Sequence, residues 1–268
     1  MNCGVIKVVL VAFLALSAII STASAFGVSG AILSEEVSPG QEIVHEITVS
    51  AGEDELPNNI TAEIYGFERN EYEVNLELDP EDDTGAYSAR SFLSLEPKSF
   101  YLEPGRTETL LLTGFVPEDV GSGGRYALVT IKTAPEESKA SSVMVVMAIQ
   151  VPVLLKIRDS ELVMTGEVSS FTASTIDGNV SADLLFENTG NVHYKPLVGA
   201  VLLDEDGTVV ARFEPAETKN SILPTGSRLV QITLVPESEL QPGTYTVVAE
   251  VTLDDGTVLD TEEATFEV

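Results

Sequence analysis

Histidine is the side chain that most often performs general acid–base catalysis. Only two histidines, His45 and His193, occur among the 268 residues, and they lie far apart along the chain. The chain has neither the Gly-x-Ser-x-Gly turn of serine hydrolases nor a glycine-rich phosphate-binding loop. Tryptophan, a frequent stacking platform for sugars, is absent. We therefore predict that the protein is not an enzyme and that both histidines are structural or face solvent.

Two short acidic clusters are candidate metal ligands. Residues 79–83 (Asp-Pro-Glu-Asp-Asp) and 204–206 (Asp-Glu-Asp) offer the oxygen ligands that calcium prefers. Neither cluster has the twelve-residue spacing of an EF-hand, and aspartate also favours turns because its side chain bonds to nearby backbone. We expect no resident cofactor, with weak Ca2+ binding as the alternative.

The composition excludes several other classes. Asp and Glu number 43 against 14 Lys and Arg, which gives a formal net charge of −29. Such an acidic surface repels phosphate, so nucleic acid is not an expected partner. An apolar content of 44% is too high for a disordered chain. The one cysteine, Cys3, excludes a disulfide scaffold.

Segment 1–25 has the features of a cleaved signal peptide. Lys7 supplies the basic start, residues 8–20 are almost wholly apolar, and residues 23–25 (Ala-Ser-Ala) match a cleavage pattern. We expect cleavage before Phe26, with an uncleaved membrane anchor as the alternative. No later stretch has the length of a membrane span, so the mature chain is expected to be secreted or exposed at the cell surface.

Short apolar runs between Gly- and Pro-containing turns predict β-strands through the rest of the chain. Pro117 and Tyr126 recur as Pro236 and Tyr245, both at the same offset, and each tyrosine opens an apolar run. Each tyrosine resembles a tyrosine corner, which is a structural feature of immunoglobulin-like domains. The fold class is therefore all-β, with two tandem immunoglobulin-like β-sandwiches after the signal peptide. The expected domains are residues 26–159 and 160–268.

The order of turns and strands resembles that of known envelope proteins. Residues 102–157, with Pro104-Gly105 and Arg125-Tyr126, resemble the first domain of surface proteins that interact with WxL-type cell-wall proteins. They also resemble the immunoglobulin-like first domain of periplasmic pilus chaperones. The segment 186–193 (Phe-Glu-Asn-Thr-Gly-Asn-Val-His) resembles immunoglobulin-like modules of bacterial and archaeal surface proteins.

The resemblance to pilus chaperones implies a basic pair that holds the C-terminal carboxylate of a client. Lys156 matches one member of this pair, but the expected first strand, residues 28–34, contains no arginine. The WxL-interacting family also usually ends in a membrane helix and a basic tail, and this sequence has neither. The resemblance therefore implies an architecture more than a particular function.

The segment 143–157 is the most informative for partner binding, because 12 of its 15 residues are apolar. A strand with one face in water should alternate, so both faces of this one must be covered. Either the second domain or a loop covers the second face, or a partner protein docks there by adding a strand. Pro152 fits an edge strand, where a missing N–H costs little. The candidate interaction residues are Val143, Val145, Met147, Ile149, Val151, Val153 and Leu155.

Two further features suit an exported protein. Asn59 and Asn179 each begin an Asn-x-Ser/Thr sequon and are candidate glycosylation sites. A small aromatic platform for sugars would consist of Tyr65, Phe67, Tyr72 and Tyr87.

These observations predict an exported, non-enzymatic protein of the cell surface or envelope. We expect its partner to be another surface protein or a cell-wall polymer. The alternatives are chaperone-like strand addition to a client and carbohydrate binding.

Overall fold

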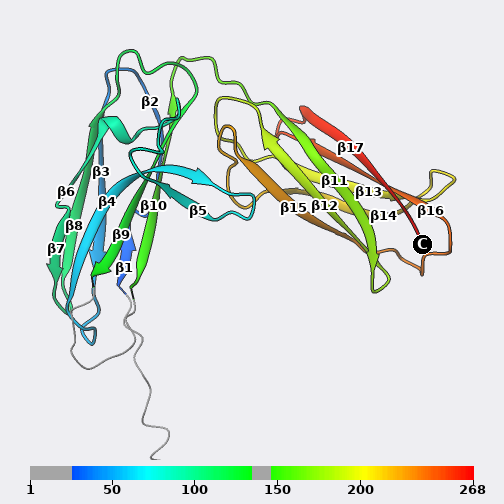
Figure 1. The fold of residues 1–268 in the computed structure, drawn as a ribbon, viewed down its shortest axis with the longest axis horizontal. Coiled ribbons are helices and arrows are strands. Elements are labelled where there is room, and N and C mark those ends of the chain that lie inside the picture. The colour runs from blue at the N-terminus through cyan, green and yellow to red at the C-terminus, as the bar shows by residue number, and fades with distance from the viewer. Residues whose placement is uncertain (1–25, 135–145) are drawn as a thin grey trace, which may run out of the picture.

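The computed structural model describes residues 26–134 and 146–268, and these form two β-sandwiches joined side by side (Figure 1). The expected signal segment lies outside the described residues. The first sandwich contains β1 (Gly27–Ser29), β2 (Leu33–Val37), β3 (Glu42–Ser50), β4 (Asn58–Arg69), β5 (Asn75–Leu78), a 3-10 turn η1 (Arg90–Phe92), β6 (Leu93–Glu96), β7 (Ser99–Leu102), β8 (Thr107–Phe115), β9 (Gly124–Ala134) and β10 (Ala148–Ile157). The second contains β11 (Gly166–Ile176), β12 (Asn179–Asn188), β13 (Leu197–Leu203), β14 (Val209–Glu217), β15 (Ser227–Leu234), β16 (Thr244–Thr252) and β17 (Val258–Glu267). Within these ranges no helix has the length and apolar content to cross a membrane.

The first sandwich packs a sheet of order β1-β3-β8-β6 on a sheet of order β2-β10-β9-β4-β5, in which β7 also pairs with β4. Strand β3 illustrates why these sequences form half-buried strands. Its Ile43, Ile47 and Val49 are buried in the core, while Glu42 and Glu46 face out. Alternation of this kind removes apolar side chains from water on one face only, which fixes the register of each strand.

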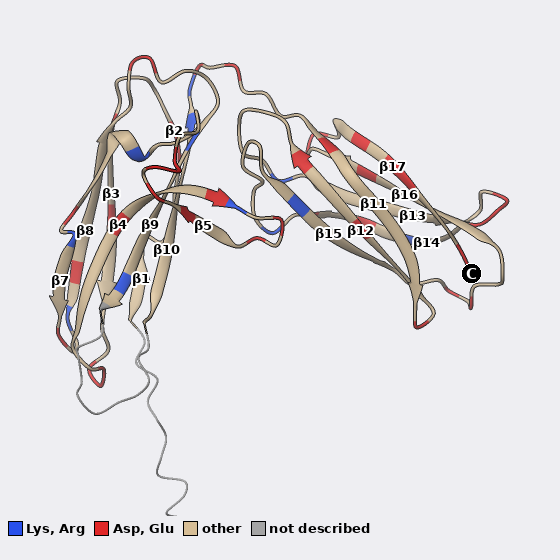
Figure 2. Ribbon diagram, viewed as in Figure 1, with Lys and Arg blue, Asp and Glu red and all other residues tan. Residues whose placement is uncertain are grey.

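The second sandwich packs sheet β11-β12-β15 on sheet β14-β13-β16-β17 around its own core. The sequence repeat falls on equivalent elements, because Pro117 and Pro236 follow β8 and β15, and Tyr126 and Tyr245 lie at the start of β9 and β16. The all-β fold class and the tandem sandwiches are therefore confirmed. In Figure 2 acidic residues are spread over both sandwiches, and basic residues are few.

The first strand differs from the expectation of one run through residues 28–34. The chain instead forms β1, which pairs with β3, and then crosses to the opposite sheet as β2, which runs parallel to β10. Gly30 makes the crossing, since its φ is 70° and a Cβ there would overlap the backbone oxygen of Glu46. Residues 258–267 form the single strand β17, which pairs with β16.

Candidate functional site: the edge of β10 and the joint between domains

The candidate interaction strand contributes most of its side chains to the core of the first sandwich. Its fully buried members are Val151, Val153 and Leu155. Met147 and Ile149 are partly buried and pack against the same core, while Val143 and Val145 lie outside the described residues. Strand β10 therefore presents to solvent its backbone edge rather than these side chains.

The opposite face of β10 is covered at two positions by other parts of the chain. Leu154 packs in a cluster with Tyr126 and with Leu223 of the second domain. Gln150 donates from Nε2 to Glu77 of β5 (3.2 Å). The unusually continuous apolar character of this strand therefore reflects cover on both faces, with the second domain providing part of it.

The edge of β10 is paired along only half of its length. Strand β9 lies along one side from Ala148 to Lys156, but on the other side β2 pairs only with Val153 to Ile157. Residues 148–152 have no second neighbouring strand among the described residues. Such an edge exposes unpaired backbone donors and acceptors, which can pair with another chain.

Pro152 indicates how this edge is oriented. A proline is tolerated in a sheet where its missing N–H points away from a ladder, so the nitrogen of Pro152 is best placed facing outward. Residues two apart in a strand share an orientation. The N–H groups of Gln150 and Ala148, in phase with Pro152, are therefore the donors expected at the open edge.

Between the domains, Tyr126 of β9 is bonded to His193. The backbone N–H of His193 donates to the Tyr126 hydroxyl (2.8 Å), and this hydroxyl lies 3.1 Å from Nδ1 of the imidazole, in position to donate its own proton. The two side chains are buried, with 2% and 6% of their surface exposed. Burial, with the charges of Lys156 and Arg69, lowers the pKa of His193 to about 4. Burial also raises the pKa of the Tyr126 phenol.

The repeat-related tyrosine is bonded differently. The Tyr245 hydroxyl donates to the carbonyl of Gln241 (3.1 Å) and accepts its N–H (3.2 Å), so it closes a loop of its own domain. This is the behaviour expected of a tyrosine corner. In the first domain the corresponding hydroxyl ties the two domains together instead.

Adjacent glycines allow the close approach of the domains at this point. Gly123 has φ 90°, and a Cβ there would overlap the backbone oxygen of Asn191. A Cβ on Gly124 would overlap the Tyr126 hydroxyl, and the Gly124 N–H donates to the Asn191 oxygen (2.8 Å). The Asn191 side chain in turn bonds to the backbone of residues 161 and 163. The Asn-Thr-Gly-Asn turn therefore organises the joint.

A hairpin formed by β4 and β5 reaches from the first domain to the second (Figure 1). At its tip Glu73 accepts bonds from Arg228 and from Asn220 Nδ2 (2.8 Å). The Leu229 N–H donates to the Glu71 carbonyl (3.0 Å), and Arg69 donates to the carbonyl of residue 221 (3.0 Å). We call this hairpin, residues 66–78, the arm.

Arg228, in β15 of the second domain, is the most buried charged residue that contacts the tip of the arm. Only 2% of its surface is exposed, and its Nε has no partner among the described residues. Burial, and secondly the charge of Arg69, lowers its pKa to about 10, so it remains a cation at neutral pH. Glu73 is therefore needed to compensate a buried positive charge.

Removing the hydroxyl of Tyr126 should weaken the joint without unfolding either sandwich. In Tyr126→Phe the N–H and Nδ1 of His193 lose their partner, which costs about 1–3 kcal/mol for a buried group. Residual dipolar couplings should then report a broadened relative orientation of the domains. Tyr245→Phe is the matched control, and it should lower the stability of the second domain while leaving that orientation unchanged. Equal orientational effects of both substitutions would contradict the assigned role.

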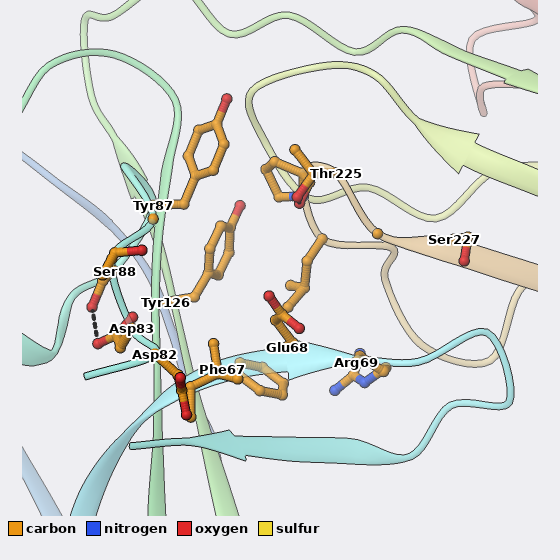
Figure 3. A pocket seen from close by; sticks show the side chains of 16 residues that line it. Phe67, Glu68, Arg69, Asp82, Asp83, Tyr87, Ser88, Tyr126, Thr225 and Ser227 are labelled. Atoms are coloured by element: carbon orange, nitrogen blue, oxygen red, sulfur yellow. Dashed lines mark hydrogen bonds between the residues drawn. The ribbon is translucent and has the colours of Figure 1, made fainter. Parts of the chain in front are cut away.

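The remaining candidate residues lie apart from one another. Phe67 and Tyr87 of the proposed aromatic platform line a pocket between the domains (Figure 3), but Tyr65 lines a different cavity and Tyr72 is exposed on the arm. His45 has Nε2 within 2.9 Å of the Gly30 carbonyl. The four aromatic side chains therefore do not form one platform.

The acidic clusters are engaged in turns and ion pairs. Asp83 accepts bonds from Ser88 (2.6 Å) and Arg90 (2.8 Å). Asp204 accepts the backbone N–H groups of residues 206 and 208. In residues 26–134 and 146–268 no group of three or more His, Cys, Asp or Glu side chains is arranged to hold a metal ion.

The two sequons differ in exposure. Asn59 is exposed on β4, whereas Asn179 is half-buried at the start of β12. Their glycosylation stays a prediction.

The contacts between the domains were not predictable from the sequence. Tyr126 and His193 were expected to be structural, but nothing in their spacing indicated that they would bond to each other. The pair Glu73 and Arg228 gave no signal, because an isolated acid in a polar turn is typical of a solvated hairpin. In retrospect, the adjacent glycines 123 and 124 are a signal of the close approach of the domains, because a turn alone does not require two glycines.

Comparison with known proteins gives similarity in fold. No protein-family model matches the chain, and no curated protein sequence matches it. Among solved structures it is similar to the class 5 fimbriae chaperone CfaA, with a TM-score of 0.43 and 13% identity over 89% of this chain and 97% of that chain. The E. coli chaperone DraB has a TM-score of 0.41 and 11% sequence identity, over 91% of this chain and 98% of that chain. The Salmonella enterica SafA pilin in complex with the SafB chaperone has a TM-score of 0.42 and 10% identity, over 92% of this chain and 98% of that chain. These are likenesses in fold alone.

Proposed function

We propose that this protein binds another protein of the cell envelope by accepting or lending a strand at the open edge of β10, residues 148–152. The observation that carries the proposal is that β2 stops pairing at Val153 while β10 continues to Ala148. Main-chain hydrogen bonds at such an edge supply affinity, and alternating side chains supply selectivity. The strand-addition alternative is therefore preferred to a cell-wall polymer as the ligand.

Support also comes from the edges of the second sandwich, which carry features that oppose pairing. Strand β17 has Glu262, Glu263 and Glu267 exposed along its edge. Strand β14, at the other edge of the same sheet, contains the exposed residue Glu214. Charges at an edge are common protection against unwanted strand addition. The open part of β10 has no charged residue.

The chaperone resemblance implies a basic pair that holds the C-terminal carboxylate of a client. We do not propose that this protein holds a client in that way. Lys156 lies in register with Glu36 of β2, and residues 28–34 contain no basic side chain. An acid therefore stands beside the lysine, and it would oppose an incoming carboxylate. The bonds to the backbone edge supply the affinity in this proposal.

We further propose that the protein acts outside the cytoplasm and is not an enzyme. The sequence of residues 1–25 supports export. The hydroxyl of Tyr126 does lie beside the imidazole of His193, but both side chains are buried between the domains, where a substrate would not reach them. The joint supports a role in presentation, since bonds at Tyr126 and at the arm hold the second domain against the first.

The proposal is tested by a backbone change at the open edge. A photo-crosslinking amino acid at the exposed position Ala148 should give discrete adducts in the source cell. Gln150→Pro removes an N–H expected to face outward and should reduce these adducts at least about tenfold, because ladder hydrogen bonds carry the binding. Gln150→Ala is the matched control, since it loses the same contact with Glu77 but keeps the N–H, and it should retain the adducts. Mass spectrometry of the adducts identifies the client.

Thermal unfolding of both variants checks that the fold is intact. Adducts that persist in Gln150→Pro, or that disappear equally in Gln150→Ala, would show that no strand is added at this edge.

A further inference from the structure

The pocket between the domains has walls of different chemistry. It encloses a volume of about 360 Å³ and is lined from the first domain by Phe67, Tyr87 and Tyr126. In Figure 3 the two phenol rings stand on the first-domain side, across from the loop that carries Thr225. Leu223 of that loop packs with Phe67 and Tyr126 in one apolar cluster, and Tyr87 packs against them, so these side chains form one continuous apolar surface of the pocket. An elongated apolar group can therefore lie against this surface.

The same pocket is lined by carboxylates that lack partners. Glu68 and Asp82 both line it, both are exposed, and no side chain among the described residues is bonded or ion-paired to either. Asp83 also lines the pocket, but Arg90 and Ser88 neutralise and orient it. Glu68 and Asp82 therefore remain available to a ligand.

Among the described residues that line the pocket, the one cation, Arg69, is already engaged. Arg69 donates from Nε to Asn75 Oδ1 (2.9 Å) and from Nη1 to the carbonyl of residue 221 (3.0 Å). Its guanidinium carbon lies 5.2 Å from the centre of the Phe67 ring. These contacts fix Arg69 within the arm, so it does not fold over Glu68 or Asp82 to neutralise them.

We propose that this pocket binds a basic side chain, lysine or arginine, of a partner protein. The methylene stem lies against the apolar surface formed by Phe67, Tyr126 and Leu223, and the charged end reaches Glu68 and Asp82. Long basic side chains combine an apolar stem with a cationic tip, and cations are attracted to aromatic faces. The net charge of −29 draws cations toward the protein over longer distances. This site is separate from the open edge of β10 and does not depend on it.

The test uses the whole mature chain and the probe acetyl-Gly-Gly-Lys-Gly-Gly-amide. Titration is followed through the NMR signals of the Tyr87 ring. We expect saturable shifts that are at least about tenfold weaker when norleucine, which has the same stem without the charge, replaces the lysine. Glu68→Gln and Asp82→Asn should each weaken binding about threefold to fivefold. Both acids are exposed, so the variants should fold normally, and circular dichroism confirms this.

The matched control is Glu237→Gln, which removes one charge from an exposed position of the second domain outside this pocket. It should change the affinity for the lysine peptide less than twofold, and the corresponding arginine peptide should bind with similar strength. Equal binding of the norleucine peptide, or equal weakening by Glu237→Gln, would overturn the proposal. Tighter binding of the neutral sugar maltose would also overturn it, and would indicate a carbohydrate site instead.

Discussion

Glu73→Ala is expected to destabilise the protein by about 3–5 kcal/mol, because it leaves the charge of Arg228 buried without a partner. Only 2% of Arg228 is exposed, and its Nε already lacks a partner in the described part of the chain. The substitution also removes the bond from Asn220. The loss should fall on the docking of the arm, so denaturant unfolding should separate into two transitions where the native protein gives one.

The chain offers a close control for this prediction. Glu71 lies in the same turn of the arm, but it receives the Leu229 N–H through its backbone carbonyl, which Glu71→Ala retains. That variant should remain within about 0.5 kcal/mol of the native protein. Adding Arg228→Met to Glu73→Ala should recover most of the loss, because no charge is then buried. Similar losses in Glu73→Ala and Glu71→Ala would contradict the role of the ion pair.

The second large effect is expected on acidification. The pKa of His193 is about 4 in the folded protein against 6.5 for an ordinary histidine, so between these values the unfolded chain binds more protons. The stability contributed by neutral His193 is complete above about pH 6.5 and decreases as the pH falls toward 4, by roughly 3 kcal/mol in total. The imidazolium could not accept the hydrogen bond of Tyr126, and it would lie near the charges of Lys156 and Arg69.

Carboxylates also titrate in this range, so the measurement is a difference between variants. Free energies of unfolding at pH 7.5 and 4.5 are compared for the native protein and for His193→Asn, which replaces the titrating ring with a neutral amide. The native protein should lose more stability over this interval than the variant. His45→Asn, on the edge of the first sandwich, should behave as the native protein does. Identical pH dependence in the native protein and His193→Asn would show that the buried histidine does not govern acid stability.

Local chemistry made the fold predictable. Runs such as that of β3 alternate because one face is buried, and the Asp-Gly turns before β14 and β17 end each strand with a residue that accepts positive φ. Gly207 and Gly256 have φ of 75° and 85°, as such turns require. The sequence repeat predicts the second domain, because the same turns recur at the same offset.

Contacts made across the chain were not predictable in the same way. Periodicity indicates that Tyr126 or Leu154 is buried, but not which domain buries it. The crossing of the first strand between sheets depends on a single glycine, Gly30, in an otherwise ordinary run. Half of β10 lacks a second neighbour because β2 begins only at Leu33, opposite Val153. The position at which β2 begins is not indicated by the composition of β10. For these reasons the sequence predicts a strand that ends at Ile157, but not which part of this strand lacks a second neighbour.

The parallel pairing of β2 with β10 has a mechanical consequence. The chain enters the first sandwich through β1 and β2 and leaves it at the end of β10, at Ile157. Tension between the two ends of the domain would pull these adjacent parallel strands in opposite directions along their length. Their hydrogen bonds would then be loaded together in shear rather than opened one at a time. The domain should therefore unfold slowly under force, and while it stays folded the force is transmitted along the chain to the second sandwich.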